Sequence, residues 1–365
     1  MYAVLFNKNG HREGFENQLL LSNTLASELN KKNREQVLFY SYDYKNELEH
    51  FNSSKKNNPL LFPQKLIIDV EKTISLNEII FDEPQQLNEI KITATVSKEE
   101  YIEKVNALKK HIQLGDIYEI NYCITFEAVN VVINPILVYQ KLNAISKAPY
   151  SALAKFNKHW IICSSPELFL HKKENVLTTK PIKGTIKRGA SFTEDKTNKK
   201  TLFNNHKERT ENVMIVDVCR NDLSRIAKKG TVDVPLLYDI ETYKQVHQMV
   251  STINCTTKEN LNLDNIITAT FPMASMTGAP KIKAMDLADT FEKYNRNSYS
   301  GTLGYRETNN DVTLNVLIRS IFYNEAHNYL SFSVGSAITI ASNAEDEYEE
   351  CLLKAKAMMT ALSNN

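Results

Sequence analysis

The alternation of hydrophobic and polar residues changes character after about residue 95. Before that point, YAVLF (2–6) and LLFPQKLIIDV (60–70) have the composition of strands, and NQLLLSNTLASELN (17–30) predicts a helix. Beyond it, strand and helix patterns follow one another over a much longer stretch. This change predicts an N-terminal layer, residues 1–95, packed on a core that spans residues 96–365.

The clearest helix signal begins at Ser97. Ser97 and Glu100 form the S-x-x-E pattern of a capping box ahead of an amphipathic stretch, and Gly115 follows as a typical stop. Further helices are predicted over 199–227, 264–271, 280–293 and 344–362, and strands over 116–129, 158–165, 167–173, 175–185, 248–255, 312–323 and 328–340. This irregular mixture predicts an α+β fold, because a parallel α/β sheet would show regular βαβα alternation.

Composition and charge narrow the class of protein. The chain has 365 residues, of which 42% are hydrophobic and 24% charged, as in ordinary globular proteins. With 44 basic and 43 acidic residues its net charge is +1, so no overall field favours nucleic acid or an anionic membrane. We find no run long enough to span a membrane and no signal-peptide pattern, and therefore expect a cytoplasmic protein.

The five cysteines bear on both compartment and chemistry. They are scattered without a C-x-x-C pair, which predicts reduced thiols in the core. None lies in a G-x-C-x-G turn, so the chain lacks the nucleophile elbow of a cysteine glutaminase.

Two predicted helices each carry a pair of glutamates spaced three residues apart. Glu208 and Glu211 share one face of the first, and Glu347 and Glu350 share one face of the last. Four carboxylates on two helices would suit Mg²⁺, which prefers oxygen ligands. The alternative is that they are exposed acids that interact favourably with the helix dipoles.

Other segments offer groups that would bind an anion. Arg319 lies in a half-apolar predicted strand, where its guanidinium needs either a ligand or an internal carboxylate. Gly335, Ser336 and Ala337 would present backbone N–H groups, or form a simple tight turn. Thr277, in MTGAPK, directly precedes a predicted helix N-terminus, a place where anions bind in some proteins and nothing binds in most.

Lys183 lies in TTKPIKGTIKRG (178–189), a strand-like segment with further cations at Lys180, Lys187 and Arg188. A lysine with its ordinary pKa of about 10.4 is protonated and not nucleophilic at neutral pH. Burial or these neighbouring cations would lower the pKa and free the amine for chemistry. The alternative is a lysine that faces solvent.

From about Ser97 to the end, roughly three quarters of its length, the chain resembles the chorismate-utilising enzymes. The motifs that carry the resemblance occur in the family's order: GDIYEIN (115–121), SSPELFL (164–170), TKPIKGT (179–185), ERTEN (208–212), IVDVCRNDLSRI (215–226), VHQMVST (246–252), FPMASMTGAPK (271–281), YSGTLGY (299–305), LIRS (317–320) and EDEYEECLLKA (345–355). The resemblance implies two interlocked antiparallel β-sheets with outer helices and the substrate between them.

Within this family, Lys183 indicates the branch. Anthranilate-forming members have alanine at this place, whereas a lysine here is typical of the aminodeoxychorismate synthases and resembles their covalent nucleophile. Water-adding relatives hold a lysine base at the place of Glu119, so its absence argues against isochorismate or salicylate formation. The resemblance thus implies component I of an aminodeoxychorismate synthase, which acts in para-aminobenzoate and folate synthesis.

The resemblance also implies roles for the candidate residues. Mg²⁺ would be held by Glu211 and Glu350 with support from Glu208 and Glu347, and Lys183 would attack chorismate while Glu167 protonates the departing hydroxyl. Neighbouring carboxylates would raise the pKa of Glu167 for that purpose. The substrate-binding residues implied are Arg319, Tyr299, Thr277, Gly335, Ser336, Ala337, Gln248 and Thr185.

Gln248 stands where anthranilate-forming relatives have histidine. Strand alternation turns His247 to the opposite face, which leaves Gln248 toward the cleft and more of the acid–base work to Glu167. Without a glutaminase of its own, the chain would take ammonia from a separate glutamine amidotransferase subunit. Two rival hypotheses remain: component I of anthranilate synthase, and a non-catalytic subunit that activates a glutaminase.

Overall fold

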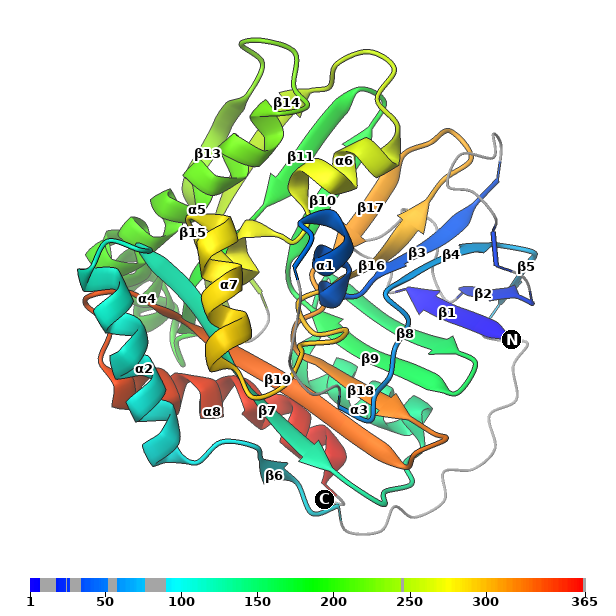
Figure 1. Ribbon diagram of the computed structural model, residues 1–365, viewed down its shortest axis with the longest axis horizontal. Helices are drawn as coiled ribbons and strands as arrows, with labels where there is room; N and C mark the ends of the chain where they lie inside the picture. Colours follow the sequence, from blue (N-terminus) through cyan, green and yellow to red (C-terminus); the bar gives the residue numbers. More distant parts are fainter. Residues whose placement is uncertain are drawn as a thin grey trace.

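The computed structural model describes residues 1–6, 18–23, 25–26, 34–51, 58–75, 90–243 and 246–363. Within these ranges the chain forms two large antiparallel sheets with helices around them (Figure 1). The predicted α+β class is therefore confirmed, and so is the pair of sheets.

A ten-stranded sheet forms one half of the molecule, in the order β15-β7-β19-β18-β9-β8-β1-β2-β5 with β6 paired to β7. Its strands are β1 (Tyr2–Phe6), β2 (Gln18–Ser22), β5 (Lys72–Ser75), β6 (Thr93–Ala94), β7 (Glu119–Ala128), β8 (Tyr150–Phe156), β9 (His159–Ser165), β15 (Gly278–Ala279), β18 (Ser320–Asn324) and β19 (Tyr329–Ile338).

A nine-stranded sheet forms the other half, in the order β12-β14-β11-β10-β17-β16-β3-β4 with β13 paired to β14. Its strands are β3 (Gln36–Tyr40), β4 (Lys65–Asp69), β10 (Leu168–Lys173), β11 (Val176–Lys180), β12 (Ile182–Lys187), β13 (Asp233–Thr242), β14 (Val246–Thr256), β16 (Thr302–Arg306) and β17 (Val312–Asn315).

Helices cover the sheets and close the core. They are α1 (Lys45–Leu48), α2 (Lys98–Gln113), α3 (Pro135–Ser146), α4 (Phe192–Asn204), α5 (His206–Ser224), α6 (Leu263–Thr270), α7 (Lys281–Phe291) and α8 (Ala344–Leu362). One hydrophobic cluster fills the space between the sheets, with residues from β3, β9, β10 and α5. A second lies where α2, α3 and α8 pack on the ten-stranded sheet.

Several predicted elements match closely. Ser97 caps α2 by accepting a hydrogen bond from the Glu100 N–H at 3.2 Å, as the sequence pattern predicted. The structure also bears out the helices predicted over 264–271, 280–293 and 344–362, as α6, α7 and α8.

Three predicted elements are divided in the structure. The predicted helix 199–227 is interrupted at Asn205, an extended residue whose side chain caps α5 by accepting from the Glu208 N–H. The predicted strand 175–185 is interrupted at Pro181, which has no N–H for a ladder. The predicted strand 312–323 is interrupted before Ser320, and its halves, β17 and β18, belong to different sheets.

The N-terminal strands extend both sheets. β1 pairs with β8, and β3 pairs with β16, so in strand pairing the first 95 residues are not a separate layer. The domain boundary near residue 95 remains a prediction. The helix predicted over 17–30 is wrong at Gln18–Ser22, which forms β2 between β1 and β5. Positions 17, 24 and 27–30 lie outside the described residues.

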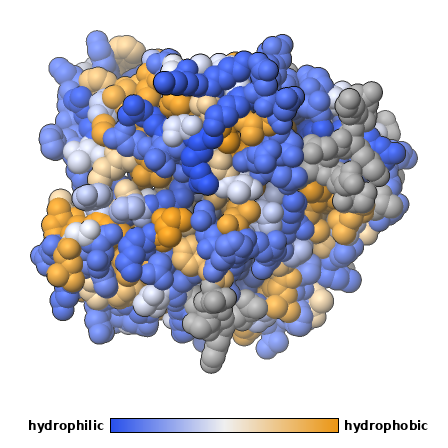
Figure 2. All heavy atoms as spheres, turned by 45° about the horizontal axis from the view of Figure 1, so that its top comes forward, coloured by the Kyte–Doolittle hydropathy of each residue, from blue (hydrophilic) through white to orange (hydrophobic). Residues whose placement is uncertain are grey.

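The polarity of the surface and the burial of the cysteines match what the composition predicted. Hydrophilic residues dominate the face in Figure 2, where hydrophobic ones form separate small groups. Among the described residues, no helix is long and apolar enough to cross a membrane. All five cysteines are buried and free, as predicted for reduced core thiols.

Candidate active site

The site lies where the chain passes between the two sheets. Glu167 follows β9 of one sheet and precedes β10 of the other, and Arg319 lies in the matching passage from β17 to β18. Because β9 pairs with β18 and β10 with β17, the two passages run side by side. Hydrogen bonds join them: the Val316 N–H donates to the Glu167 carbonyl at 3.0 Å, and the Ser164 N–H donates to the Arg319 carbonyl at 3.2 Å.

Arg319 reaches the site for a different reason from the one predicted. It adopts a left-handed backbone conformation, φ 49°, in the passage, so strand alternation does not set its direction. Burial lowers the pKa of the Arg319 guanidinium, and the nearby Glu167 and Tyr243 oppose that effect. Among the described residues no salt bridge to this guanidinium is found within 4 Å, so the alternative of an internal ion pair is not supported. A half-buried guanidinium without an ion-pair partner among the described residues suits a carboxylate ligand.

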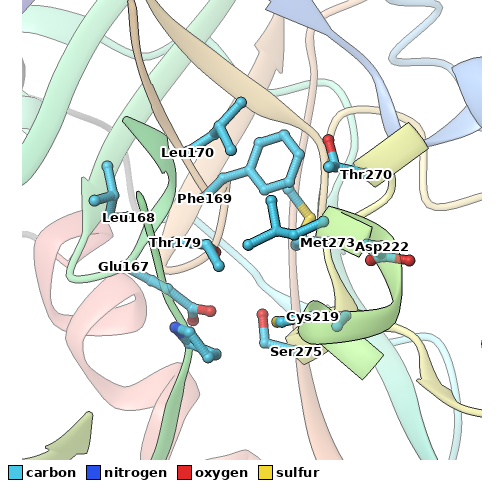
Figure 3. A pocket seen from close by; sticks show the side chains of 13 residues that line it. Glu167, Leu168, Phe169, Leu170, Thr179, Cys219, Asp222, Thr270, Met273 and Ser275 are labelled. Carbon is cyan, nitrogen blue, oxygen red and sulfur yellow. The ribbon is translucent and has the colours of Figure 1, made fainter. Parts of the chain in front are cut away.

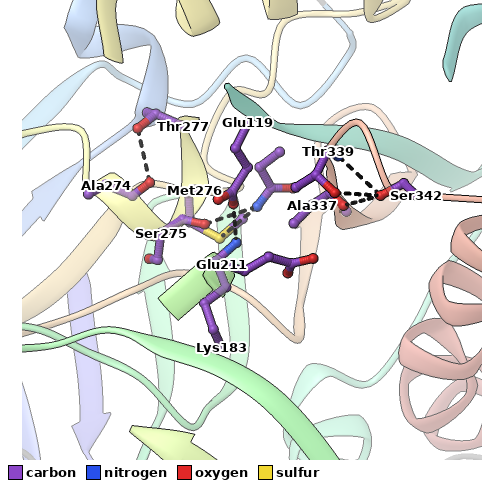
Figure 4. A network of polar contacts seen from close by, with 12 residues as sticks. Glu119, Lys183, Glu211, Ala274, Ser275, Met276, Thr277, Ala337, Thr339 and Ser342 are labelled. Atoms are coloured by element: carbon purple, nitrogen blue, oxygen red, sulfur yellow. Dashed lines mark hydrogen bonds and ion pairs between the residues drawn. The ribbon is translucent and has the colours of Figure 1, made fainter. Parts of the chain in front are cut away.

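Lys183 joins the two sheets through an ion pair. Its Nζ donates to Glu119 Oε1 at 2.6 Å, and both side chains are buried, with 9% and 1% of their surface exposed (Figure 4). Lys183 lies on β12, at one end of the nine-stranded sheet, and Glu119 begins β7 near one end of the ten-stranded sheet. The alternative of a solvent-facing lysine is therefore excluded.

Two glycines allow this approach. Gly278 on β15 has φ 149°, and a Cβ there would lie 2.2 Å from the Glu119 carbonyl oxygen, so only glycine lets β15 close against β7. Gly184 has φ 85° and lies within a register shift between Ile182 and Thr185. This irregularity interrupts the alternation of β12 directly after Lys183.

The ionisation of Lys183 differs from the prediction. Burial alone would lower the pKa of this amine, but the carboxylates of Glu119, Glu211 and Glu167 together raise it above its ordinary value. The neighbouring cations do not lower it, because Lys180 pairs with Glu241 at 3.2 Å and Arg188 pairs with Asp195 at 2.7 Å. In the ligand-free protein Lys183 is therefore an ammonium.

Glu167 borders a small cavity between β10, α5 and the segment 270–275 (Figure 3). Apolar side chains form much of its wall, including those of Phe169, Leu170 and Met273. Burial raises the pKa of Glu167 to about 7, whereas Ser275, Lys183 and Arg319 oppose the shift. The predicted raised pKa is thus present, but desolvation is its cause, and the predicted neighbouring carboxylates are not.

The four predicted metal ligands lie at the N-terminal ends of α5 and α8. Glu211 and Glu347 are buried, Glu208 is half-buried, and Glu350 is 44% exposed and pairs with Lys354 at 2.6 Å. The Lys207 ammonium lies between the two buried carboxylates, 2.9 Å from Glu347 and 3.8 Å from Glu211.

The donor set fits a cation without forming a complete cage. Among the residues that the structure describes, no three acidic, histidine or cysteine side chains converge closely enough to hold a metal. However, Glu211 Oε1 is buried and accepts no hydrogen bond from the described residues, and burial raises the pKa of Glu211 to about 7. A buried carboxylate oxygen without a donor is a suitable ligand for a hard cation. Magnesium binding remains a prediction.

Gln248 and Thr185 face each other in the ladder between β12 and β14 but differ in exposure. Gln248 is 1% exposed, and within the described ranges its Oε1 has no hydrogen-bond donor, which leaves this acceptor available to a ligand. His247 instead bonds to Asp195 at 3.0 Å, consistent with the opposite face. Thr185 is exposed, because the irregularity at Gly184 separates its orientation from that of Lys183.

The segment Gly335–Ala337 is not a turn. It lies within β19, and the three residues pair in register with Cys123, Tyr122 and Asn121 of β7. Its backbone groups therefore belong to a sheet ladder, so the predicted anion-binding turn is wrong in its backbone geometry. The Ser336 hydroxyl is hydrogen-bonded to the Tyr101 hydroxyl at 2.8 Å.

Thr277 and Tyr299 are both buried. The Thr277 hydroxyl donates to the Ala274 carbonyl at 3.1 Å, and the Thr277 carbonyl accepts from the Asn121 N–H at 2.9 Å. Burial is the first cause that raises the pKa of Tyr299, with Cys123 as the next. Whether these side chains bind substrate remains a prediction.

Three neighbours of the site were not singled out from the sequence as functional. Glu119 was considered only as the place of a lysine in water-adding relatives, although it makes the ion pair with Lys183. Ser275 lies beside Glu167, and Lys207 lies between the carboxylates. Lys207 was detectable, since it precedes Glu211 by four helical positions and therefore shares its face.

The site therefore combines a buried lysine, a protonatable glutamate, nearby carboxylates and an arginine that has no ion pair among the described residues. Such a combination is typical of an enzyme site for a small anionic substrate. Residues 12–360 match the family described as chorismate binding enzyme, and the chain belongs to this family.

Curated relatives and solved structures agree with this assignment. The chain is 41% identical over 271 residues to the chloroplastic aminodeoxychorismate synthase of Arabidopsis thaliana, covering 73% of this chain and 29% of the relative. It is 34% identical to aminodeoxychorismate synthase component 1 of Bacillus subtilis (strain 168), covering 74% and 57%. Anthranilate synthase component I from Streptococcus pneumoniae TIGR4 shares the fold, with a TM-score of 0.79 at 22% identity over 98% of this chain and 92% of that one.

The chain matches between 29% and 37% of the length of the first four curated relatives. Those relatives therefore contain much that this chain does not match, and their activities come to it only as a proposal.

Proposed function

We propose that the chain is component I of an aminodeoxychorismate synthase, which converts chorismate and ammonia to 4-amino-4-deoxychorismate. The observation that carries the proposal is Lys183, buried in the site at the place where anthranilate-forming enzymes have alanine. Its contact with an acid from the opposite sheet supports a functional role over an incidental one. Similarity to several aminodeoxychorismate synthases supports the same activity.

In the first step, the Lys183 amine attacks C2 of chorismate and the ring double bonds shift. The C4–O bond breaks, and Glu167 gives the departing hydroxyl a proton so that it leaves as water. A carboxyl group whose pKa is raised to about 7 is suited to this donation at neutral pH.

In the second step, ammonia attacks C4, the double bonds shift back, and the bond between C2 and Lys183 breaks. The new ammonium group on C4 gives its surplus proton to Glu167, which restores the acid for the next turnover. The ring thereby gains the amino group and keeps its enolpyruvyl side chain. We infer that a separate glutamine amidotransferase supplies the ammonia, since the five cysteines of this chain are buried in its core. We also propose a cytoplasmic location, where such thiols stay reduced.

For substrate binding, Arg319 and Tyr299 would hold the enolpyruvyl carboxylate, and Gln248 and Thr277 would contact the ring. Glu211, Glu350, Glu208 and Glu347 would hold Mg²⁺, which supplies positive charge for the ring carboxylate. Two observations support these assignments: Arg319 is half-buried, and the Oε1 atoms of Gln248 and Glu211 accept no hydrogen bond from the described residues.

Product identification tests the proposal. The protein is incubated with chorismate, Mg²⁺ and ammonium. The products are separated by chromatography, and their molecular masses are measured by mass spectrometry. A non-aromatic amine that retains the enolpyruvyl group is the expected product. An aromatic amine accompanied by pyruvate would instead identify an anthranilate synthase, whose fold this chain shares.

The third hypothesis, a non-catalytic subunit that activates a glutaminase, has a different outcome. A folded sample would then leave chorismate unconsumed even in excess ammonium. The joint presence of Lys183, Arg319 and the four carboxylates argues against this hypothesis, because a subunit that only activates a glutaminase does not need a full set of candidate catalytic groups.

A further inference from the structure

Lys183 must lose a proton before it can act as a nucleophile in the proposed reaction, and the residues around it suggest where that proton goes. A covalent attack needs a neutral amine, whereas the ligand-free protein holds an ammonium in a buried ion pair. Its proton must therefore pass to another group before the N–C bond forms. Because the Nζ atom is buried, a group in direct contact is a better acceptor than bulk water.

Glu119 is that contact. Its Oε1 lies 2.6 Å from Lys183 Nζ, within the distance for direct proton transfer. Among the ion pairs of the described residues, this is the only one that Lys183 makes. The other carboxylates that act on Lys183 lie beyond ion-pair distance: Glu167 between β9 and β10, Glu208 and Glu211 on α5, and Glu350 on α8.

The other oxygen of Glu119 also favours this role. Glu119 is fully buried, and its Oε2 receives no hydrogen bond from any described residue. Among the described residues, Lys183 is the only one that donates to the Glu119 carboxylate, so transfer of the proton within the pair removes two buried charges at once.

We propose that Glu119 is the base that accepts the Lys183 proton and so releases the amine for attack. In this step an N–H bond of Nζ breaks and an O–H bond forms on Glu119, which leaves both groups neutral. The lone pair then forms the bond to C2, and the leaving hydroxyl takes its proton from Glu167. When ammonia displaces the lysine, the freed amine recovers its proton from Glu119. This inference rests on the proposed function.

Single-turnover adduct formation tests the role of Glu119. The unaltered chain and three variants are mixed with chorismate and saturating Mg²⁺ without ammonium, then quenched. The variants are Glu119→Gln, Glu119→Asp and an exposed control, Glu103→Gln. Mass spectrometry of the intact protein measures the adduct, which should add the mass of chorismate minus that of one water molecule. Lys183→Met sets the background.

The pH profile distinguishes a base from a merely structural group. Between about pH 5 and 6, where Glu167 with its pKa of about 7 stays mostly protonated, the unaltered protein should form adduct at a nearly constant rate, because the proton stays inside the pair. In Glu119→Gln the proton must go to water, so the rate should be about 100-fold lower at pH 6 and rise about tenfold per pH unit. Glu103→Gln should match the unaltered protein.

Two other outcomes would overturn the assignment of Glu119 or the proposed function. Lys183-dependent adduct formation in Glu119→Gln with an unchanged rate and a flat profile overturns the assignment of Glu119 and leaves the proposed function intact. An absence of adduct in the unaltered protein overturns both. Should Glu119→Gln fail to fold, Glu119→Asp decides, since a slower but flat profile supports the base and a rising one rejects it.

Discussion

Replacing Glu167 with glutamine should make the protein more stable at alkaline pH while it abolishes the proposed activity. Glu167 is 4% exposed in an apolar cavity, and its burial opposes the charged form. Glutamine has nearly the same shape and carries no charge, so Glu167→Gln removes the desolvation cost without leaving a void. The stabilisation should depend on pH, because the unaltered glutamate is charged only above its pKa.

The size of the effect follows from the pKa. In the unfolded chain the carboxyl has its ordinary pKa of 4.5, and in the folded protein the pKa is about 7. Because the folded state binds the proton more tightly, raising the pH through this interval destabilises the folded protein. The full difference corresponds to about 3 kcal/mol. Relative to the unaltered protein, Glu167→Gln should gain nothing near pH 4.5 and about 3 kcal/mol at pH 8.

Urea titrations at several pH values between about 5 and 8 measure this difference as a free energy of unfolding. The exposed Glu103→Gln variant serves as the matched control and should show no comparable trend. A stability difference between Glu167→Gln and the unaltered protein that stays constant with pH would refute the reasoning. So would a difference of opposite sign, which would mean that Lys183 and Arg319 outweigh burial.

Three further predictions address the remaining parts of the site. Lys183→Met should lower the free energy of unfolding at pH 8 by about 3–5 kcal/mol because Glu119 loses its buried partner, and adding Glu119→Gln should recover most of it in urea titrations. Gly278→Ala should cost at least about 3 kcal/mol by the same measurement, since its Cβ would collide with a carbonyl oxygen. Gly115 also has a positive φ of 84° but has open space around it, so the control Gly115→Ala should cost only about 1–2 kcal/mol. The unaltered protein should show a Mg²⁺-dependent rise in Tm in thermal denaturation, and Glu211→Gln should abolish that rise; an equal rise in both would exclude Glu211 as a ligand.

Local sequence patterns predicted the elements that depend on nearby residues. Helix α2 begins at its Ser97 cap, and α8 covers the residues that its periodicity indicated, because capping and amphipathicity act within a few turns. The ordered motifs predicted the family, and that prediction is confirmed over residues 12–360. In each case the information lies in residues close together along the chain.

The orientation of site residues was harder to predict, since it depends on where strands end and irregularities occur. Arg319 was placed on a strand face but lies in a passage between sheets. Thr185 was grouped with Lys183, but the irregularity at Gly184 turns it to solvent. Gly335–Ala337 was expected as an anion-binding turn and forms part of a strand. Single residues can redirect a side chain without changing the hydrophobic pattern around them.

The sequence by itself determined the family, the α+β class and the choice of Lys183 as the residue to examine. Only the tertiary structure decided the charge on that lysine. Glu119, which holds it, lies 64 positions away on a strand of the other sheet. A pKa depends on the charges and the solvent within a few ångströms, and these are brought together by the packing of two sheets, which no local pattern encodes.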